Sequence, residues 1–304
     1  MTVRSYETPA AFKQALEQRL RNASSSGADL ARRRQILVFD RFLARLVEEH
    51  GNAVTLKGGL ALELRLDRAR TTKDIDVRMM GAPGAVLESL RAAARRDLGD
   101  FLQFTVHPDE SHAVIPGDGL KYDGFRFKAR CTLAGKIYGH QFGVDVAFGD
   151  PIFGEPDLIA AADSLGFAGI APPILRVYPI ETHIAEKLHA LTLPRSRPNS
   201  RIKDLPDLAL IASTGSLTAT KVRAAIEQTF AFRDTHQAPL QLPDPPPSWT
   251  APYAALARAN DLRWATLEEV AKAAKAFLDP VLGFEHEAQW EPTKWAWLRS
   301  PGPS

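Results

Sequence analysis

The first 51 residues show apolar side chains at helical spacing. Thr8 and Pro9 predict the start of a first helix, because proline suits the first helical position, and the Ser-Ser-Ser-Gly stretch at residues 24–27 interrupts it. A second helix is predicted over residues 29–49, and Gly51 ends its pattern. Its apolar face comprises Leu30, Ile36, Leu37, Phe39, Phe42, Leu43 and Leu46.

Extended segments dominate the next part of the chain. The pattern predicts strands over residues 53–56, 74–77 and 101–107, with a helix near residues 85–97. Around Gly135, polar and apolar side chains alternate on both sides, which predicts a hairpin. Its two arms are residues 124–134 and 136–148.

From about residue 179 the pattern becomes helical, and residues 237–252 form a proline-rich linker. The predicted helices cover residues 181–193, 205–212, 217–232 and 267–277, the last with a capping box at Thr266 and Glu269. The fold class is therefore α/β (α+β), with a mixed sheet. We expect an α/β domain over residues 1–178 and a mainly helical domain over residues 179–304, with the active site in the cleft between them.

Composition adds a few limits. The chain has 304 residues, of which 45% are hydrophobic and 24% charged, and its net charge of +2 is too small to indicate nucleic acid by itself. The single cysteine, Cys131, excludes an internal disulfide and a cysteine-based metal cluster. No apolar run of spanning length and no basic-then-apolar leader is present, so we expect a cytoplasmic protein without a membrane partner.

Candidate chemistry begins where the strand at residues 53–56 meets Lys57, Gly58 and Gly59. Glycines between a strand and a helix let backbone amides approach a phosphate, although such a pair is more often only a tight turn. Asp74 and Asp76 follow at alternate positions of the next strand, so both carboxylates lie on one face. Two carboxylates there suit Mg²⁺, and the whole stretch predicts a nucleotide and metal site.

A third carboxylate would complete such a site. Asp145 lies in an apolar strand, where an unpaired charge is costly, and is the best candidate. The alternatives are that Asp145 caps a strand end or pairs with Arg130. Asp150 is the fallback, although the Asp-Pro pair it forms with Pro151 is more typical of a turn.

These residues resemble the AbiEii/AbiGii-type nucleotidyltransferase toxins, a branch of the polymerase β-like nucleotidyltransferase superfamily. The resemblance covers about residues 35–215 and is strongest in two blocks. The first comprises Gly58, Gly59, Arg70, Thr72, Asp74 and Asp76, and the second comprises residues 181–191 and 201–208. Gly59 departs from the family, which often has serine there; backbone amides, Thr55 or Lys57 would then bind the phosphate.

The resemblance implies roles for residues that spacing alone leaves open. Lys187, by spacing more often a solvated side chain, is expected to face the triphosphate. Asp204 is expected to orient Lys187 or Arg201, or to assist deprotonation of the acceptor, with Asp207 as a structural partner of a nearby cation. The expected nucleotide-binding residues are Lys57, Gly58, Gly59, Thr72, Lys187 and Arg201, and the expected metal ligands are Asp74, Asp76 and Asp145.

Other charged and polar groups have weaker expectations. His183 and His189 are expected to be packing or surface residues. A basic loop contains Arg195, Arg197, Arg201 and Lys203, which are either solvated or clamp phosphates. Residues 32–34 and Arg91, Arg95 and Arg96 are plain charged helix faces by default, and are also where RNA contacts would be sought.

The expected function follows from the resemblance. Two Mg²⁺ ions would bridge an NTP, and an acceptor hydroxyl would attack its α-phosphate. The implied acceptor is the 3′ end of a tRNA, whose modification blocks aminoacylation. The implied partner is a separately encoded antitoxin, in this family often a winged-helix AbiEi-type repressor, and the two form a toxin–antitoxin or phage-defence pair. Transfer to a protein side chain or to a small molecule such as an aminoglycoside, and a non-catalytic module that only binds nucleotide or a partner, remain open.

Overall fold

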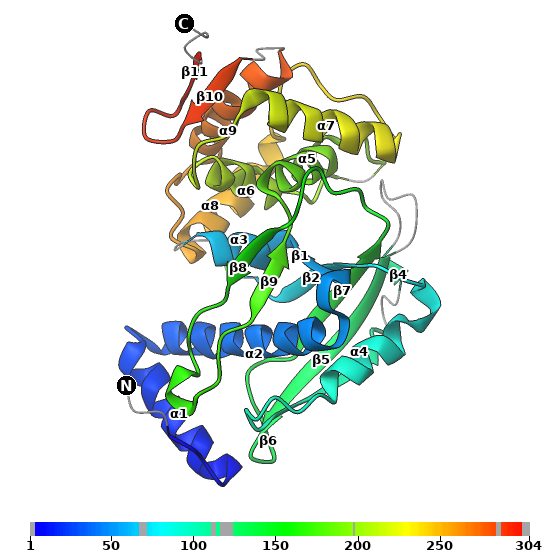
Figure 1. The fold of residues 1–304 in the computed structure, drawn as a ribbon. Helices are drawn as coiled ribbons and strands as arrows, with labels where there is room; N and C mark the ends of the chain where they lie inside the picture. Colours follow the sequence, from blue (N-terminus) through cyan, green and yellow to red (C-terminus); the bar gives the residue numbers. More distant parts are fainter. Residues whose placement is uncertain are drawn as a thin grey trace, which may run out of the picture.

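The computed structural model describes residues 4–66, 72–110, 114–115, 124–196, 198–283 and 287–299 (Figure 1). A mixed sheet with its helices makes up the N-terminal part, and a mainly helical part follows, at the top of Figure 1. Among the described residues, no helix is both long enough and apolar enough to cross a bilayer.

Nine of the described strands form the sheet, in the order β3-β5-β7-β2-β1-β9-β8, with β4 and β6 paired to β5. Strand β2 runs parallel to β7, and β1 runs parallel to β9, whereas β2 and β1 are antiparallel. The strands are β1 (Val54–Lys57), β2 (Asp74–Met79), β3 (Leu102–Pro108), β4 (Val114–Ile115), β5 (Gly124–Leu133), β6 (Lys136–Ile137), β7 (Phe142–Phe148), β8 (Asp157–Ala160) and β9 (Ile174–Val177).

Helices α1 (Pro9–Ala23), α2 (Gly27–His50) and α4 (Val86–Ala94) pack around this sheet, and α2 crosses it in Figure 1. The hydroxyl of Thr8 accepts a hydrogen bond from the amide of Ala11, and Ser26 caps α2 in the same way, so both helices begin at polar caps. The apolar face of α2 packs with Phe104 and Phe142 of the sheet in one hydrophobic core.

A buried ion-pair network also ties α2 to the sheet. Asp100, which is fully buried, accepts hydrogen bonds from Arg41 at 2.7 Å and from Arg45 at 2.7 and 2.9 Å. The Arg45 side chain additionally donates to the backbone carbonyl of Leu102 at 2.7 Å. Two arginines therefore lie on the buried side of a helix whose sequence pattern predicts only apolar contacts there.

The C-terminal part has a second core, built from helices and a closing hairpin. Trp290 is fully buried there, and its indole N–H donates to the carbonyl of Ala212 at 2.6 Å. The elements are α5 (Ile180–Thr192), α6 (Asp204–Ile211), α7 (Ala219–Arg233), α8 (Thr250–Ala259), α9 (Leu267–Leu282), β10 (Ala288–Glu291) and β11 (Ala296–Arg299). The capping box of α9 at Thr266 and Glu269 is confirmed.

Helix α3 (Gly58–Arg65) connects the two parts. Leu60 and Ala61 belong to the core of the sheet, whereas the next residue, Leu62, packs in the helical core. The first core otherwise ends at Val177 and the second begins at Ile184. The mixed sheet and the helical C-terminal part confirm the predicted fold class, and the division at residue 178 stays a proposal about domains.

The predicted hairpin forms, but its second arm is interrupted. Strand β6 pairs with the end of β5, and after a break at residues 138–141 strand β7 resumes the antiparallel pairing with β5. Gly139 lies in this break with a φ of +72°, and the side chain of Gln35 accepts a hydrogen bond from the amide of His140 at 2.7 Å. A left-handed residue cannot continue a strand, so the alternating pattern there does not produce one.

Several elements have no counterpart in the sequence prediction. Strands β8 and β9 are short, and β8 at the sheet edge is mostly exposed, so it shows no alternation. Helix α8 begins inside the proline-rich segment and buries only Tyr253 and Ala257, which gives a weak helical signal. The hairpin of β10 and β11 turns at Trp295, which has a φ of +52° without being glycine.

Candidate active site

The central strands bring the predicted acidic residues together by their register. Asp76 of β2 pairs with Asp145 of β7 on one side and with Lys57 of β1 on the other. Asp74 lies two residues before Asp76 and is therefore on the same face of β2. Asp76 and Asp145 are partly buried, whereas Asp74 is exposed at the strand start. The three aspartates thus lie on one face of a parallel strand pair.

Gly58 makes room for Asp76. Its φ is +70°, and a Cβ added there would lie 2.6 Å from Cγ and 2.8 Å from Cβ of Asp76. Any side chain at this position would displace the carboxylate, and the backbone conformation independently favours glycine. The diglycine turn therefore has a second role besides the predicted phosphate approach: it leaves space for an acid.

Asp74, Asp76 and Asp145 form the acidic group of the site, and their mutual repulsion affects Asp76. Burial and the neighbouring Asp145 raise the pKa of Asp76 to about 6, and Asp74 adds to this effect, while Lys57 opposes it. The carboxylate of Asp74 is held at the strand edge, where it accepts a hydrogen bond from the amide of Gly143 at 3.1 Å.

The partner of Asp145 is Arg126, and not Arg130 as the pairing alternative proposed. The guanidinium of Arg126 donates to both carboxylate oxygens of Asp145, at 2.8 and 2.6 Å. Arg126 lies opposite Asp145 in the antiparallel pair of β5 and β7, whereas Arg130 lies opposite Thr105 of β3. Alternation places both arginines on one face of β5, and only the register, which the sequence does not give, distinguishes them.

Lys57 is held by two acids. Its ammonium contacts Asp150 at 2.7 Å and Glu186 at 3.1 Å. Burial opposes the charge, but Glu186 and Asp150 hold the pKa of Lys57 well above its ordinary value. Arg233 joins the same network through Glu186 at 3.1 Å. Lys57 also lines the cleft, and its role as a phosphate ligand stays a prediction. The fallback metal ligand Asp150 is a buried partner of this lysine.

Lys187 bridges two acids of α6. Its ammonium lies 3.1 Å from Asp204 and 2.7 Å from Asp207, and all three residues are buried. Asp204 thus takes one of its expected positions, beside Lys187, and Asp207 is the structural partner of a cation. The second oxygen of Asp204 is buried without a hydrogen-bond partner among the described residues.

His183 lies one turn before Lys187 on α5 and is almost completely buried. Burial, with Lys187 nearby, holds the pKa of His183 well below its ordinary value, so its ring is neutral at pH 7. Neither ring nitrogen has a hydrogen-bond partner among the described residues. His189 differs, since its ring contacts the hydroxyl of Thr235 at 2.8 Å and packs in the core.

A cleft of about 290 Å³ lies between the sheet and the helical part, and it gathers most of the predicted site residues. Thr72 and Asp74 are not among the described residues that line it, and the hydroxyl of Thr72 donates to the backbone carbonyl of Asp74 at 3.2 Å. The charged and polar lining comprises Lys57, Asp76, Arg126, Asp145, His183, Glu186, Lys187, Arg201, Asp204 and Arg233, together with Gly58 and Gly59. Arg70 and Arg197 lie outside the described residues.

The family match decides what kind of protein carries this cleft. A family model described as "Nucleotidyl transferase AbiEii toxin, Type IV TA system" matches residues 41–298. The chain belongs to this family. The AbiEii match covers the second core, most of the first core and every described residue that lines the cleft, and it confirms the resemblance found in the sequence. The protein is thus a nucleotidyl transferase toxin of a type IV toxin–antitoxin system, which has an antitoxin as its partner.

Solved structures from other organisms are similar to this chain. MenT4, a nucleotidyltransferase toxin from Mycobacterium tuberculosis, has a TM-score of 0.56 and 16% identity, over 92% of this chain and 92% of its own. JHP933 from Helicobacter pylori has a TM-score of 0.47 and 15% identity, over 82% of this chain and 92% of its own. At these identities the similarity to MenT4 shows a common fold. No curated protein matches the chain.

The chemistry of the acidic group fits a divalent cation of the kind nucleotidyl transferases use. Its donors are carboxylate oxygens on adjacent strands, and the raised pKa of Asp76 reflects negative charge that a cation would offset. Yet no group of three or more His, Cys, Asp or Glu side chains in the described part of the chain is arranged as a metal cluster. The reason lies in their present partners, because Asp145 faces Arg126 and Asp74 faces an amide.

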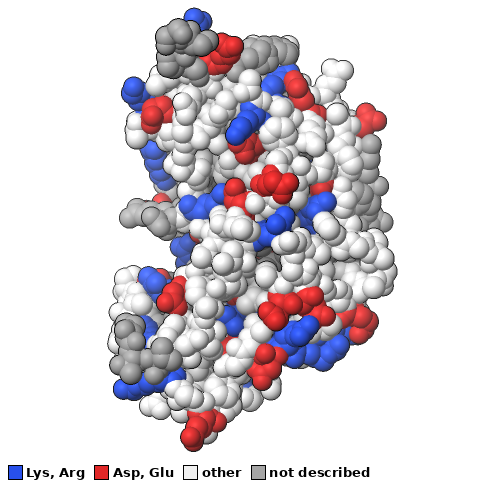
Figure 2. Space-filling model, viewed as in Figure 1, with Lys and Arg blue, Asp and Glu red and all other residues white. Residues whose placement is uncertain are grey.

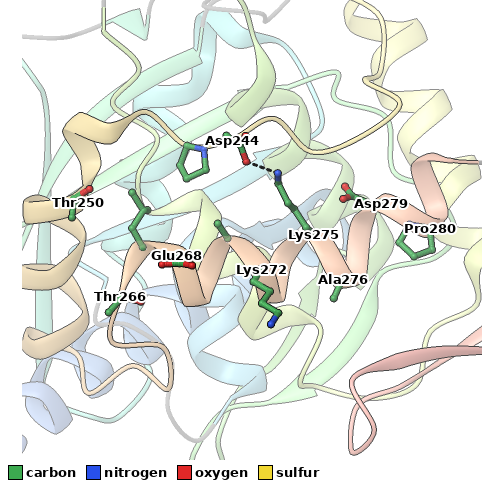
Figure 3. A pocket seen from close by; sticks show the side chains of 12 residues that line it. Asp244, Thr250, Thr266, Glu268, Lys272, Lys275, Ala276, Asp279 and Pro280 are labelled. Atoms are coloured by element: carbon green, nitrogen blue, oxygen red, sulfur yellow. Dashed lines mark hydrogen bonds and ion pairs between the residues drawn. The ribbon is translucent and has the colours of Figure 1, made fainter.

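The surface outside the cleft has none of the predicted site residues in its larger cavity, and its charges are mixed on one face. A larger cavity of about 860 Å³ lies along α9, where Lys275 pairs with Asp244, and it contains none of the predicted site residues (Figure 3). On the face drawn in Figure 2, basic and acidic side chains are interspersed. The three consecutive arginines near the start of α2 are each ion-paired: Arg32 with Glu63, Arg33 with Asp29, and Arg34 with Glu17.

Proposed function

We propose that this toxin transfers a nucleoside monophosphate from an NTP to an acceptor hydroxyl and releases pyrophosphate. The observation that supports this most is the register that sets Asp76 beside Asp145 at the cleft, with Gly58 leaving space for the carboxylate. We propose Asp74, Asp76 and Asp145 as the residues that hold Mg²⁺, with two ions as the expected number. When bound, the metal would offset the charge of the phosphates and of the attacking oxygen.

The protein groups then have distinct tasks. The amides at Gly58 and Gly59 lie at the start of α3, where the helix dipole favours the negative charge of a phosphate. Arg201 and Lys187 line the same cleft and add positive charge near the leaving pyrophosphate. Thr72 is proposed to act indirectly, by holding the backbone of Asp74.

The acceptor hydroxyl must lose a proton as its oxygen bonds to the α-phosphorus and the bond to the β-phosphate oxygen breaks. Asp204 has a buried carboxylate oxygen without a hydrogen-bond partner among the described residues, and it lines the cleft. Lys187 fixes the other oxygen at 3.1 Å. We propose that the first of these two Asp204 oxygens accepts the hydrogen bond of the acceptor hydroxyl and takes up its proton as the pyrophosphate leaves.

The proposed acceptor is the 3′ end of a tRNA, which rests on the family and on the motif resemblance rather than on a basic groove. The described lining carries both signs, with Arg126 and Arg201 beside Asp76 and Glu186. A volume of about 290 Å³ accommodates a nucleotide end or a small molecule. Transfer to a small molecule or a protein side chain is therefore the second candidate. We further propose a separately encoded winged-helix antitoxin as the partner.

Incubation with each labelled NTP, Mg²⁺ and one acceptor class at a time tests the proposal. The acceptors are total tRNA, tRNA whose 3′ end has been oxidised by periodate, total cell protein and an aminoglycoside. We expect label on intact tRNA only, because oxidation removes the attacking hydroxyl. Label on protein or aminoglycoside instead would replace tRNA by the second candidate.

The matched variants are Asp76→Asn and Asp244→Asn. Both remove one negative charge, but Asp244 is exposed and lies at the other cavity, so its variant should keep full activity. Asp76→Asn should lose transfer and cellular toxicity while remaining folded. Unchanged toxicity of Asp76→Asn would show a non-catalytic binding module, and folded wild-type protein that labels none of the acceptors would overturn the proposed reaction.

A further inference from the structure

Arg126 is a cation bound directly to the acidic group, through Asp145. It donates to Asp145 at 2.8 and 2.6 Å, in a bidentate pair. These hydrogen bonds raise the pKa of Arg126, and the charges of Asp74 and Asp76 raise it further. The guanidinium therefore offsets part of the charge that a divalent cation would offset.

This pairing has a direct consequence for cation binding. Both oxygens of Asp145 accept N–H groups of Arg126, so a metal ion can use them only after these hydrogen bonds break. A guanidinium and a divalent cation also repel each other at such distances. Arg126 and the cation are thus alternative partners of one carboxylate.

Arg126 can leave its position more easily than the two lysines of the cleft. Its side chain is 36% exposed, whereas that of Lys57 is 14% exposed and that of Lys187 is 8% exposed. Each lysine also lies between two acids, one of which is fully buried in each pair: Asp150 beside Lys57 and Asp207 beside Lys187. Moving either lysine would leave a buried charge, which is costly.

We propose that Arg126 is an exchangeable counter-ion: it binds Asp145 in the free protein and turns to the phosphates when an NTP and a divalent cation enter. This rests on the proposed nucleotidyl transfer. A nucleotide and its cation would supply new partners for both residues, because the cation would bind Asp145 and the phosphates would bind the guanidinium of Arg126. Cation and nucleotide then bind with positive coupling, and Arg126 carries that coupling.

Binding of Mn²⁺, measured by electron paramagnetic resonance without nucleotide or acceptor, tests the exchange. Arg126→Met and Arg126→Gln remove the competing charge, so the Kd for Mn²⁺ should fall about tenfold in each. Lys128→Met is the matched control, because Lys128 lies on the same face of β5 but pairs with Asp109 at 3.2 Å, outside the residues that line the cleft. Its Kd should equal that of the wild type.

The coupling supplies a second measurement. A non-hydrolysable NTP analogue should tighten Mn²⁺ binding to the wild type and to Arg126→Lys, which keeps the charge, but much less to Arg126→Met. An unchanged or weaker Mn²⁺ affinity in both Arg126→Met and Arg126→Gln would overturn the exchange, whichever reaction the enzyme performs. Undiminished Mn²⁺ binding by Asp76→Asn would instead refute the proposed metal site, so the two failures are distinguishable.

Discussion

Replacing Gly58 with alanine tests whether this glycine is there to make room for Asp76. A methyl group would lie 2.6 Å from Cγ and 2.8 Å from Cβ of Asp76. Rotation of the Asp76 side chain can move Cγ but not Cβ, so the backbone of β1 or β2 must shift. The left-handed conformation costs about 1–2 kcal/mol for alanine, and overpacking adds about 1–3 kcal/mol. Gly58→Ala should therefore lower the free energy of unfolding by roughly 2–5 kcal/mol.

Gly135→Ala is the matched control. Gly135 has a φ of +69°, close to the +70° of Gly58, but an added Cβ would meet nothing within 4 Å. It should cost only the conformational part, about 1–2 kcal/mol, in urea denaturation. Gly58→Ala should also reduce nucleotidyl transfer by about a hundredfold, because Asp76 is displaced. Equal stability of the two variants, with full transfer by Gly58→Ala, would refute the steric account.

Three further predictions concern buried charges. Asp100→Ala removes the acidic partner of two buried arginines and should lower the free energy of unfolding by about 3–5 kcal/mol in urea denaturation. Lys187→Ala should reduce stability as well as transfer because it removes a cation from the buried Asp207, and adding Asp207→Ala should restore part of the stability but not the transfer. Burial raises the pKa of Asp40 to about 7, so the folded protein binds this proton more tightly than the unfolded chain, whose value is near 3.8. The free energy of unfolding of the wild type should consequently decrease as the pH rises from about 4 to 7. The variant Asp40→Asn should not show this decrease, and at pH 8 it should be more stable than the wild type by up to about 4 kcal/mol in urea denaturation.

The sequence predicts those features that depend on neighbouring positions. The helical spacing of residues 29–49 gives α2 within two residues at its start and one at its end, and the Thr266–Glu269 capping box marks the start of α9. Spacing of two residues in a strand places Asp74 and Asp76 on one face. Each of these needs only local geometry, which the residue pattern contains.

The residue pattern does not predict features that depend on how distant strands and helices pair in the fold. Arg126 and Arg130 are equivalent in the alternation of β5, and only the pairing of β5 with β7 selects Arg126. Likewise, nothing local links Lys57 with Glu186, which is 129 positions away and on a helix of the other core. The ion pairs of Lys57 could not be predicted from the sequence because they form across the whole fold.

The distribution of these ion pairs also determines which cations can respond to a substrate. Lys57 and Lys187 are each fixed between two acids, so they contribute positive potential from constant positions. Arg126 is more than a third exposed and can change partner without leaving a fully buried carboxylate behind, and Arg201 is exposed as well. Nucleotide binding should therefore reorganise the two arginines and leave the two lysines in place. Because a guanidinium binds phosphate oxygens in a bidentate way that an ammonium cannot, the mobile positions are also those whose residue type suits a polyphosphate.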